Sequence, residues 1–325
     1  MYTVLVTGVG AIIGYGLARS LRASQYPVRI IGMDIYPDAV GQHWCDVFEQ
    51  AVPAADPGYP EFLRTVIRTH AIDLVIPGIE QDVARMSQEA QSNAFGDLSV
   101  SFALNNPELI AAASDKWVMH GELTGAGFET IGTHISGDFA ELASIYGLPL
   151  LSKPRRSYAS KGIQQISNHA DFLYWRAKLG DNFMVQEVVG TVDTEYTVGA
   201  FGLGNGQCSQ QIVFQRMLSR EGATAKARVR SIPELETLVG RMVEVFRPIG
   251  PTNLQFRFHR GRYLLLEINP RVSSSSSLRT AFGYNEAEMC IEYYLEGKTP
   301  RRREICGGSA VRYIDDMVFY DCPDS

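Results

Sequence analysis

Four polar side chains in the last third of the sequence have the types and spacing needed to hold a metal ion beside a phosphoryl group. Glu267 and Asn269 lie at the end of a strand-like run, and an earlier strand-like run carries Gln255. A tight turn at Gly261 would join the two runs into a hairpin, and a three-residue turn places Gln255 opposite Glu267. One carboxylate and two amide oxygens suit Mg²⁺, which completes its shell with water and phosphate. Arg271 follows with a guanidinium suited to a phosphoryl group in transfer.

The alternative is a surface hairpin whose polar side chains face water. Three consecutive leucines, Leu264–Leu266, precede Glu267, and such a run would usually continue into a hydrophobic core. A run of serines, Ser273–Ser277, follows Arg271 and also needs an explanation. We therefore favour the metal-site interpretation of the hairpin.

A second group of residues has the composition of a phosphate-binding loop. Lys153 ends a strand-like run, and Ser160, Lys161 and Gly162 follow in a segment of small residues. Small residues let backbone N–H groups approach phosphate oxygens, and lysines supply positive charge. The order of a Walker A loop is absent, so a basic surface loop remains the alternative. Arg216, at the end of a later strand, is a candidate for binding the transferred phosphate or a substrate carboxylate, although surface arginines beside loops are common.

Length and composition describe an ordinary protein of two or three domains. The 325 residues are 45% apolar and 20% charged, and the formal net charge is −6. A negative charge argues against nucleic acid as the main partner, and no apolar run reaches the length of a membrane span. The start of the chain enters a strand without the basic segment of a signal peptide. Five scattered cysteines without CxxC spacing predict reduced thiols in the cytoplasm.

Strands and helices alternate over about the first 105 residues, which predicts an α/β domain with a parallel sheet. The expected strands there are 4–6, 29–33, 74–76 and 99–102, and the expected helices are 60–70 and 81–90, with one more ending at 21. Further along, helices are expected at 137–146, 168–179, 233–246 and 285–295.

The turn Thr7–Gly14 also resembles a dinucleotide-binding glycine loop, with Asp34 as the acceptor of ribose hydroxyls. The last glycine spacing is one residue too long for GxGxxG. Tyr174 and Lys178 supply a Tyr–Lys pair of the kind that nicotinamide-dependent epimerases and reductases use. That spacing often arises by chance on a helix, so this function is kept only as an alternative.

The segment Glu267-Ile-Asn269-Pro-Arg271, with Asn253-Leu-Gln255 at a hairpin's distance before it, resembles the metal-binding motif of the ATP-grasp superfamily. A glutamine as the first ligand is similar to the carbamoyl-phosphate synthase large-subunit branch. The resemblance implies a ligase that uses ATP with Mg²⁺ or Mn²⁺ to convert a small-molecule carboxylate into an acyl phosphate. An amine or ammonia would then attack the acyl phosphate, with release of ADP and phosphate. One unit argues against the full carbamoyl-phosphate synthase reaction, because that enzyme fuses two such units.

Other segments match the same superfamily in its order, and the resemblance assigns them to nucleotide or substrate. The phosphate-binding residues would be Lys116, Lys153, Ser160, Lys161 and Gly162. The hinge would place Glu187 and Val189 beside the adenine and Glu195 at the ribose. Substrate would contact Gly10, Arg216, Ser273, Ser274 and Arg279. Catalysis would rest on positioning and on charge neutralisation by the metal, Lys116, Lys153 and Arg271, with Lys153 and Arg271 as the catalytic residues and little covalent chemistry from side chains.

The implied fold is an α/β ATP-grasp fold in three parts: a Rossmann-like domain over residues 1–110, a lid over 111–188 and a C-terminal part over 189–325. ATP would lie between the last two parts, and a homodimer is compatible with this plan. First domains of this kind usually bind no dinucleotide in the superfamily, which accounts for the glycine turn. A catalytically silent nucleotide-binding relative is a further alternative, and the complete set of hairpin residues argues against it.

Overall fold

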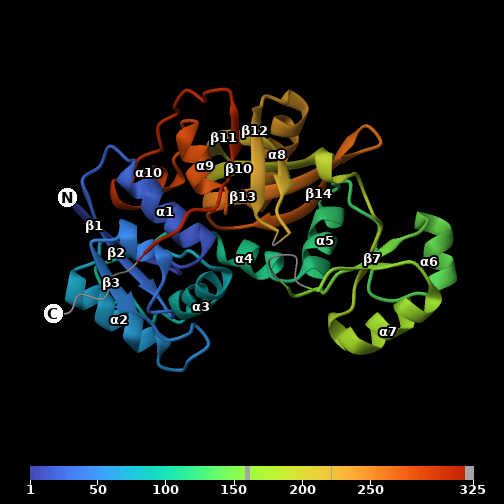
Figure 1. Ribbon diagram of the computed structural model, residues 1–325, viewed down its shortest axis with the longest axis horizontal. Helices are drawn as coiled ribbons and strands as arrows, with labels where there is room; N and C mark the ends of the chain where they lie inside the picture. The colour runs from blue at the N-terminus through green and yellow to red at the C-terminus, as the bar shows by residue number, and fades with distance from the viewer. Residues whose placement is uncertain (158–161, 221, 319–325) are drawn as a thin grey trace.

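The computed structural model describes residues 1–157, 162–220 and 222–318, and its first part is built on a parallel sheet (Figure 1). The strand order is β3 (Val47–Gln50), β2 (Val28–Asp34), β1 (Tyr2–Thr7), β4 (Leu74–Ile76) and β5 (Ser101–Phe102). Its helices are α1 (Ile12–Arg22), η1 (Val40–Trp44), α2 (Tyr59–His70) and α3 (Glu80–Gln91). The central strands are continuously buried because helices cover both faces, so the predicted parallel sheet is confirmed. Strand β3 lacks a clear apolar run and was missed.

The second part is a small antiparallel sheet with its own core. Its strand order is β6 (Thr133–His134), β9 (Val185–Gln186), β7 (Leu150–Ser152) and β8 (Gln164–Ile166). Helices α6 (Phe139–Tyr146) and α7 (His169–Leu179) cover it, and η2 (Gly180–Asn182) leads into β9. Leu142, Phe172 and Phe183 lie in a hydrophobic cluster that includes no residue of the other two sheets. This lid lies at the opposite end of the molecule from the N-terminal sheet (Figure 1).

The third part is a six-stranded antiparallel sheet covered on both faces. Its strand order is β14 (Arg262–Asn269), β13 (Ile249–His259), β10 (Glu195–Leu203), β11 (Cys208–Leu218), β12 (Thr224–Arg230) and β15 (Ser309–Val311). One face packs on α8 (Pro233–Phe246), α4 (Pro107–Ala113) and α5 (Lys116–Gly125). Against the other lie residues of α10 (Glu286–Cys290) and of the π-helical turn η4 (Ile291–Leu295). The serine run continues into the short helix α9 (Ser276–Ala281), and η3 (Val192–Thr194) precedes β10.

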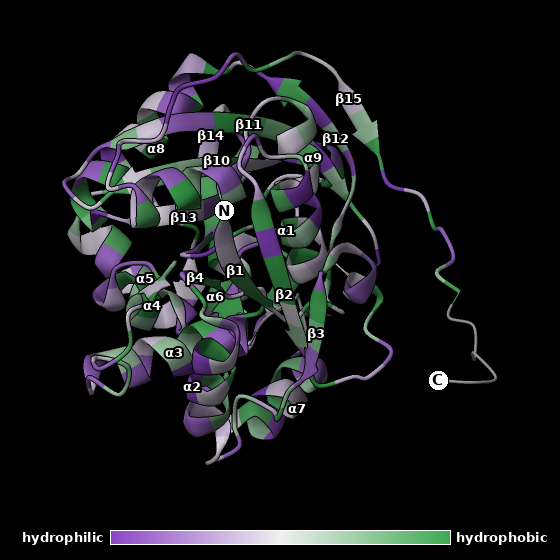
Figure 2. Ribbon diagram, turned by 90° about the vertical axis from the view of Figure 1, so that its left-hand side faces the viewer, coloured by the Kyte–Doolittle hydropathy of each residue, from purple (hydrophilic) through white to green (hydrophobic). Residues whose placement is uncertain are grey.

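Helix α1 joins the first and third parts into one packed body. Its apolar side chains share a hydrophobic cluster with β11, α10 and η4, so the N-terminal sheet is not an independent core. The Ser20 hydroxyl lies 2.9 Å from that of Thr280, and the Asn285 amide donates to the Ser20 carbonyl oxygen at 2.9 Å. Figure 2 shows α1 between strands β1 and β2 on one side and α9 on the other. Each sheet falls inside one of the ranges predicted for the three parts, whose limits stay predictions.

Within the described residues, none of the helices has both the length and the apolar character needed to cross a membrane.

Candidate active site

The hairpin of β13 and β14 places its polar residues as predicted, but by a different turn. Gln255 pairs with Glu267. The turn holds two residues, Arg260 and Gly261, both with positive φ, as a tight hairpin turn requires. The turn is one residue shorter than predicted, and a β-bulge makes up the difference: Phe256 pairs with Leu265 and Gln255 with Glu267, so Leu266 is the extra, unpaired residue. Turn and bulge together restore the register that places the two side chains on one face.

A cavity of about 610 Å³ opens where the three parts of the molecule meet. The N-terminal part contributes the segments 11–13 and 78–81, and the lid contributes Lys153, Ser157 and Gln186. The sheet of the third part contributes the hairpin residues and Arg216, and Lys116 projects from the start of α5. The sequence prediction that a site lies beside the hairpin is therefore matched by a cavity large enough for a nucleotide and a small substrate.

Glu267 lines this cavity and is held in its charged form. Burial alone would raise the pKa of its carboxyl group, but the positive charge of Lys153 opposes that effect. A hydrogen bond from the Asn269 amide to Glu267 Oε1, 3.1 Å long, acts in the same direction, as do Lys116 and Arg271. The pKa of Glu267 therefore lies below its usual value, and the side chain is a carboxylate at neutral pH. A charged oxygen donor of this kind is what a divalent cation needs.

The two amides beside Glu267 already have partners in the protein. Gln255 Oε1 accepts a hydrogen bond of 2.5 Å from Arg216, and Asn269 Oδ1 accepts one of 3.2 Å from Arg271. The donor set of one carboxylate and two amide oxygens fits a hard cation that takes its other ligands from phosphates and water. The structure brings the three predicted ligands together, and the two amides would have to share their oxygens with arginines.

Two lysines, the buried Lys153 and the partly buried Lys116, line the cavity close enough to Glu267 to act on its charge. Lys116 begins α5, where Asp115 caps the helix by accepting the Trp117 N–H. Lys116 Nζ donates to the Ser157 carbonyl oxygen at 2.7 Å and lies 3.1 Å from the Ser157 hydroxyl. Burial, followed by repulsion from Lys153, lowers the pKa of Lys116 to about 8. Burial also lowers the pKa of Lys153. A phosphate group beside these amino groups would stabilise their charged forms and accept charge-assisted hydrogen bonds from them.

The affinity for ADP is expected to decrease as the pH rises through 8. Lys116 has a pKa of about 8, so it is mostly charged at pH 7 and mostly neutral at pH 9. A neutral amine cannot pair with a phosphate, and we expect the dissociation constant to rise about tenfold between these pH values. Calorimetric titration of ADP at both values measures the change. In Lys116→Arg, which stays charged, the difference should disappear; an equally steep dependence in that variant would exclude Lys116 as its origin.

The loop that follows β7 is described only in part. Ser160 and Lys161 lie outside the described residues, so their predicted contacts with phosphate stay predictions. Gly162 has a φ of 78° and does not line the cavity. The loop is anchored at its start, because Arg155 makes two hydrogen bonds to the Asp115 carboxylate, 2.8 and 3.1 Å long.

The predicted hinge borders the cavity through a neighbouring residue. Gln186 lines the cavity, whereas Glu187 donates its backbone N–H to the Gly132 carbonyl oxygen at 2.8 Å. Val189 is buried, and its carbonyl oxygen accepts a hydrogen bond of 3.3 Å from Arg257. The segment therefore borders the cavity at Gln186, and the contacts of Glu187 and Val189 with an adenine ring stay predictions.

Glu195 is placed differently from the expectation. The residue is 3% exposed and does not line the cavity. One carboxylate oxygen accepts two hydrogen bonds from Arg216, and the other accepts two from Arg257, at 2.9 to 3.2 Å. Both oxygens are thereby used by guanidinium groups, so the structure does not present Glu195 to a ribose. The sequence could not show this pairing, because the three residues come together only through the register of β10 with its two neighbours.

Replacing Glu195 with alanine is expected to lower the stability of the nucleotide-free protein. The change would leave the buried Arg216 without its counter-ion, at a cost of about 2 kcal/mol of unfolding free energy. Thermal or urea unfolding without nucleotide measures the loss. An unchanged midpoint with a weakened ATP affinity would instead support the ribose contact that the sequence predicts.

Arg271 lies in the cavity and is paired with a residue that the sequence analysis missed. Its guanidinium forms an ion pair with Glu80, in the first turn of α3, and donates to the Val272 carbonyl oxygen at 3.0 Å. Glu80 follows β4 at the carboxyl edge of the parallel sheet, where ligands bind in sheets of this type. The position of Glu80 shortly after a predicted parallel strand could have marked it as a candidate site residue in the sequence. The ion pair links the N-terminal part to the end of β14 across the cavity.

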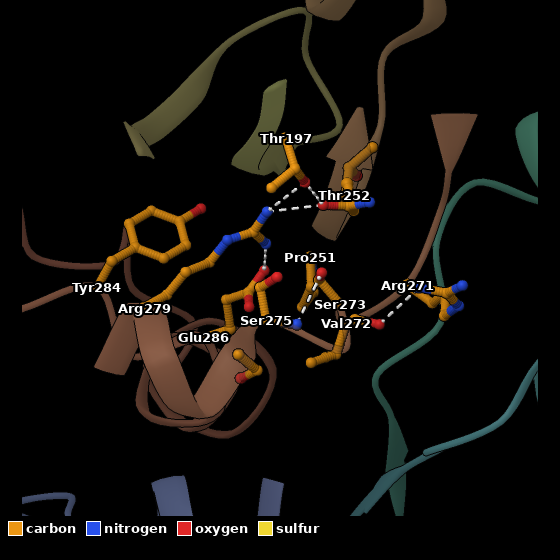
Figure 3. A network of polar contacts seen from close by, with 12 residues as sticks. Thr197, Pro251, Thr252, Arg271, Val272, Ser273, Ser275, Arg279, Tyr284 and Glu286 are labelled. Carbon is orange, nitrogen blue, oxygen red and sulfur yellow. Dashed lines mark hydrogen bonds and ion pairs between the residues drawn. The ribbon is translucent and has the colours of Figure 1, made fainter. Parts of the chain in front are cut away.

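The serine run contributes to the cavity, whereas Arg279 does not. Ser273 and Ser274 line the cavity, and the Ser273 hydroxyl accepts the Ser275 N–H at 3.0 Å (Figure 3). Arg279 is fully buried beneath them: it pairs with Glu286 at 3.1 Å and donates to Thr197 at 3.1 Å (Figure 3). The predicted substrate contact of Arg279 is therefore wrong for this arrangement, because the side chain belongs to the interior.

Gly10 and the residues of the nicotinamide alternative also lie elsewhere. The Gly10 N–H donates to Asp34 at 2.7 Å, and the neighbouring segment 11–13 lines the cavity instead. Asp34 is buried by this contact, which removes the acceptor that a dinucleotide ribose would need. Tyr174 and Lys178 lie on α7 in the lid, at the far end of the molecule from the glycine turn (Figure 1). The structure therefore does not assemble the parts of a nicotinamide site.

Comparisons with known proteins agree with the fold. The model of a family described as "ATP-grasp in the biosynthetic pathway with Ter operon" matches residues 180–317. The carbamoyl phosphate synthase large chain of Methanothrix thermoacetophila is 24% identical over 255 residues. That match covers 70% of this chain and 23% of the relative, so the chain spans less than a quarter of that protein.

Solved structures resemble the chain over nearly its whole length. N5-carboxyaminoimidazole synthetase from Staphylococcus aureus, complexed with ADP, has a TM-score of 0.72 and 16% identity over 95% of this chain and 80% of that one. The biotin carboxylase domain of Hydrogenobacter thermophilus 2-oxoglutarate carboxylase, with MgADP and bicarbonate, has a TM-score of 0.72 and 15% identity over 94% and 73%. Sequence identities this low show the fold alone. Together with the hairpin motif and the family model over residues 180–317, they show that the chain has the ATP-grasp fold.

Proposed function

We propose that the protein is an ADP-forming ligase that joins a small-molecule carboxylate to an amine or ammonia. The observation that carries this proposal is the cavity in which ionised Glu267 faces Lys153, Lys116 and Arg271. A polyanion with a divalent cation complements such a site, since the carboxylate attracts the metal and the surrounding cations attract phosphates. The relatives with this fold are described with ADP, ATP or MgADP, which supports a nucleotide as the polyanion.

Lys116 and Lys153 are proposed to bind the phosphate groups. Lys153 is buried and Lys116 is partly buried, so their charges are screened less by water than surface charges are. Ser157 holds Lys116 in place through its carbonyl oxygen. Fixed cations of this kind stabilise charge that develops on a phosphoryl group in transfer, and they do so without reorganising.

Glu267, with Gln255 and Asn269, would hold Mg²⁺ or Mn²⁺. A divalent ion held there would supply positive charge that offsets the negative charge of the phosphoryl group. Arg271 lies at the boundary between this group and the N-terminal part, where the carboxylate substrate would approach. Ser273 and Ser274 line the same end of the cavity and supply polar groups for the acyl oxygens.

The experiment that tests the nucleotide is thermal unfolding with Mg²⁺-ATP, Mg²⁺-ADP or NAD(P)H. A ligand that binds only the folded state raises the unfolding temperature. Stabilisation is expected with the adenine nucleotides. A shift with NAD(P)H and none with ATP would refute the proposal. Release of ADP in mixtures of carboxylates with amines then tests the ligase reaction; binding of ATP without ADP release in any mixture would indicate a silent relative.

A further inference from the structure

Arg216 is a buried cation that lines the cavity and contacts the predicted metal ligand Gln255. It comes from β11 and is 3% exposed. The guanidinium makes four hydrogen bonds: two to Glu195, one of 3.3 Å to the Thr224 hydroxyl and one of 2.5 Å to Gln255 Oε1. A guanidinium has five N–H groups, so one is left over for a ligand in the cavity.

The hydrogen bond to Gln255 places this cation at a predicted metal ligand. Catalytic sites with two divalent ions hold them about 3.5–4 Å apart, usually with carboxylates to balance the charge. The hairpin supplies one carboxylate, Glu267, and two neutral amides. A second ion beside Gln255 would have to displace Arg216 from its oxygen or lie against a buried guanidinium. Either arrangement costs free energy, because like charges repel strongly where little water is present.

The charge of the cavity agrees with a single metal ion. Among the described residues, its charged lining includes the cations Lys116, Lys153, Arg156, Arg216 and Arg271. The carboxylates in that lining are Glu80 and Glu267, which leaves a surplus of three positive charges. ATP with one divalent ion and a carboxylate substrate carries about three negative charges, whereas a second divalent ion would reduce that to about one.

The surplus does not change when the neighbouring ion pairs are included. Next to the lining residues, Glu195 forms an ion pair with Arg257, and Asp115 forms one with Arg155. Each addition contributes one carboxylate and one guanidinium. The positive surplus is therefore a property of the whole site.

We propose that the site takes its nucleoside triphosphate with one divalent cation, and that the guanidinium of Arg216 stands where a second cation would otherwise bind. This inference rests on the proposed nucleotide-binding function. Arg216 then acts as a fixed counter-charge for phosphate oxygens, held by Glu195 from behind. Glu195 is a positioning residue in this arrangement, since it touches Arg216 and not the cavity.

The test counts bound Mn²⁺ by electron paramagnetic resonance in the presence of saturating β,γ-imido-ATP. One Mn²⁺ per chain is expected for the wild type. The variant Glu195→Gln/Arg216→Gln removes the guanidinium without leaving a buried carboxylate behind. It is expected to bind a second Mn²⁺, and its affinity for the analogue at limiting Mn²⁺ should fall about tenfold or more.

Arg257→Gln is the matched control, because Arg257 contacts the same carboxylate from outside the cavity. It should retain one Mn²⁺ per chain. Two Mn²⁺ in the wild type, or a single one in the double variant when circular dichroism shows it folded, would overturn the inference and leave the ligase proposal intact. If the double variant does not fold, the number of Mn²⁺ ions bound per wild-type chain decides: one supports the inference and two overturn it. No binding of the analogue to the wild type would overturn both proposals.

Discussion

Glu267→Gln is expected to lower ADP release at saturating ATP and Mg²⁺ by at least about 100-fold, the loss typical of removing one preorganised electrostatic group. Glutamine has the same shape and can still accept a hydrogen bond from Asn269, so the hairpin should fold normally. The change removes the negative charge that Lys153, Lys116 and Arg271 stabilise and that would attract the metal. Mg²⁺ exchanges its water ligands for a neutral amide oxygen much less readily than for a carboxylate, so the variant should bind the metal weakly. The phosphoryl group would then lose most of its charge compensation.

The measurement is steady-state ADP release by both proteins once a substrate pair is known, with circular dichroism to confirm the fold. Glu129→Gln is a suitable control, since Glu129 forms an ion pair with Arg262 at the exposed tip of the same hairpin. That surface change should leave activity near the wild-type level. Near-normal release by folded Glu267→Gln would mean that the hairpin is structural and that the chemistry takes place elsewhere.

Arg279→Met is expected to lower the free energy of unfolding by about 3–5 kcal/mol, the usual cost of removing one partner of a buried ion pair. Arg279 and Glu286 are both fully buried, so the variant would leave the Glu286 carboxylate without a counter-charge. Burial already raises the pKa of Glu286 despite Arg279. Because the pKa is raised in the folded state, the variant should be most stable at acidic pH and lose stability as the pH rises.

Urea unfolding of the wild type and the variant at several pH values measures both effects. The double variant Arg279→Met/Glu286→Leu removes both charges, and its stability should return most of the way to that of the wild type. Unchanged stability in Arg279→Met, together with weaker saturation by the carboxylate substrate, would restore the substrate contact that the sequence predicted for Arg279.

The sequence predicted the architecture well because its signals are local. Alternation of apolar runs with helical periodicity located β1, β2, β4, α2 and α8 to within a residue or two. The hairpin motif predicted which side chains face one another, because register and face follow from strand geometry. Even there, the compensation between the shorter turn and the bulge at Leu266 depends on backbone conformation that residue types do not specify.

The predictions that failed concern side chains whose partners are distant in sequence. Arg279 looks like a substrate ligand after a serine run, yet it is paired with Glu286 and Thr197 inside the protein. Glu195 matches a ribose ligand by position, yet two strands bring arginines to it. A charged residue gives the same signal in a sequence whether its partner is a ligand or another residue. Only the fold decides between them.

The packing of α1 has a consequence for synthesis of the chain. Its apolar side chains share one core with α10 and η4, more than 250 residues later, and Asn285 donates to the carbonyl oxygen of Ser20. When the first strands leave the ribosome, the surface that will cover α1 does not yet exist. The lid has a self-contained core and can form early. Nascent chains should therefore expose the apolar side of α1 until residues 286–295 have been synthesised, and they should depend most on chaperones during that interval.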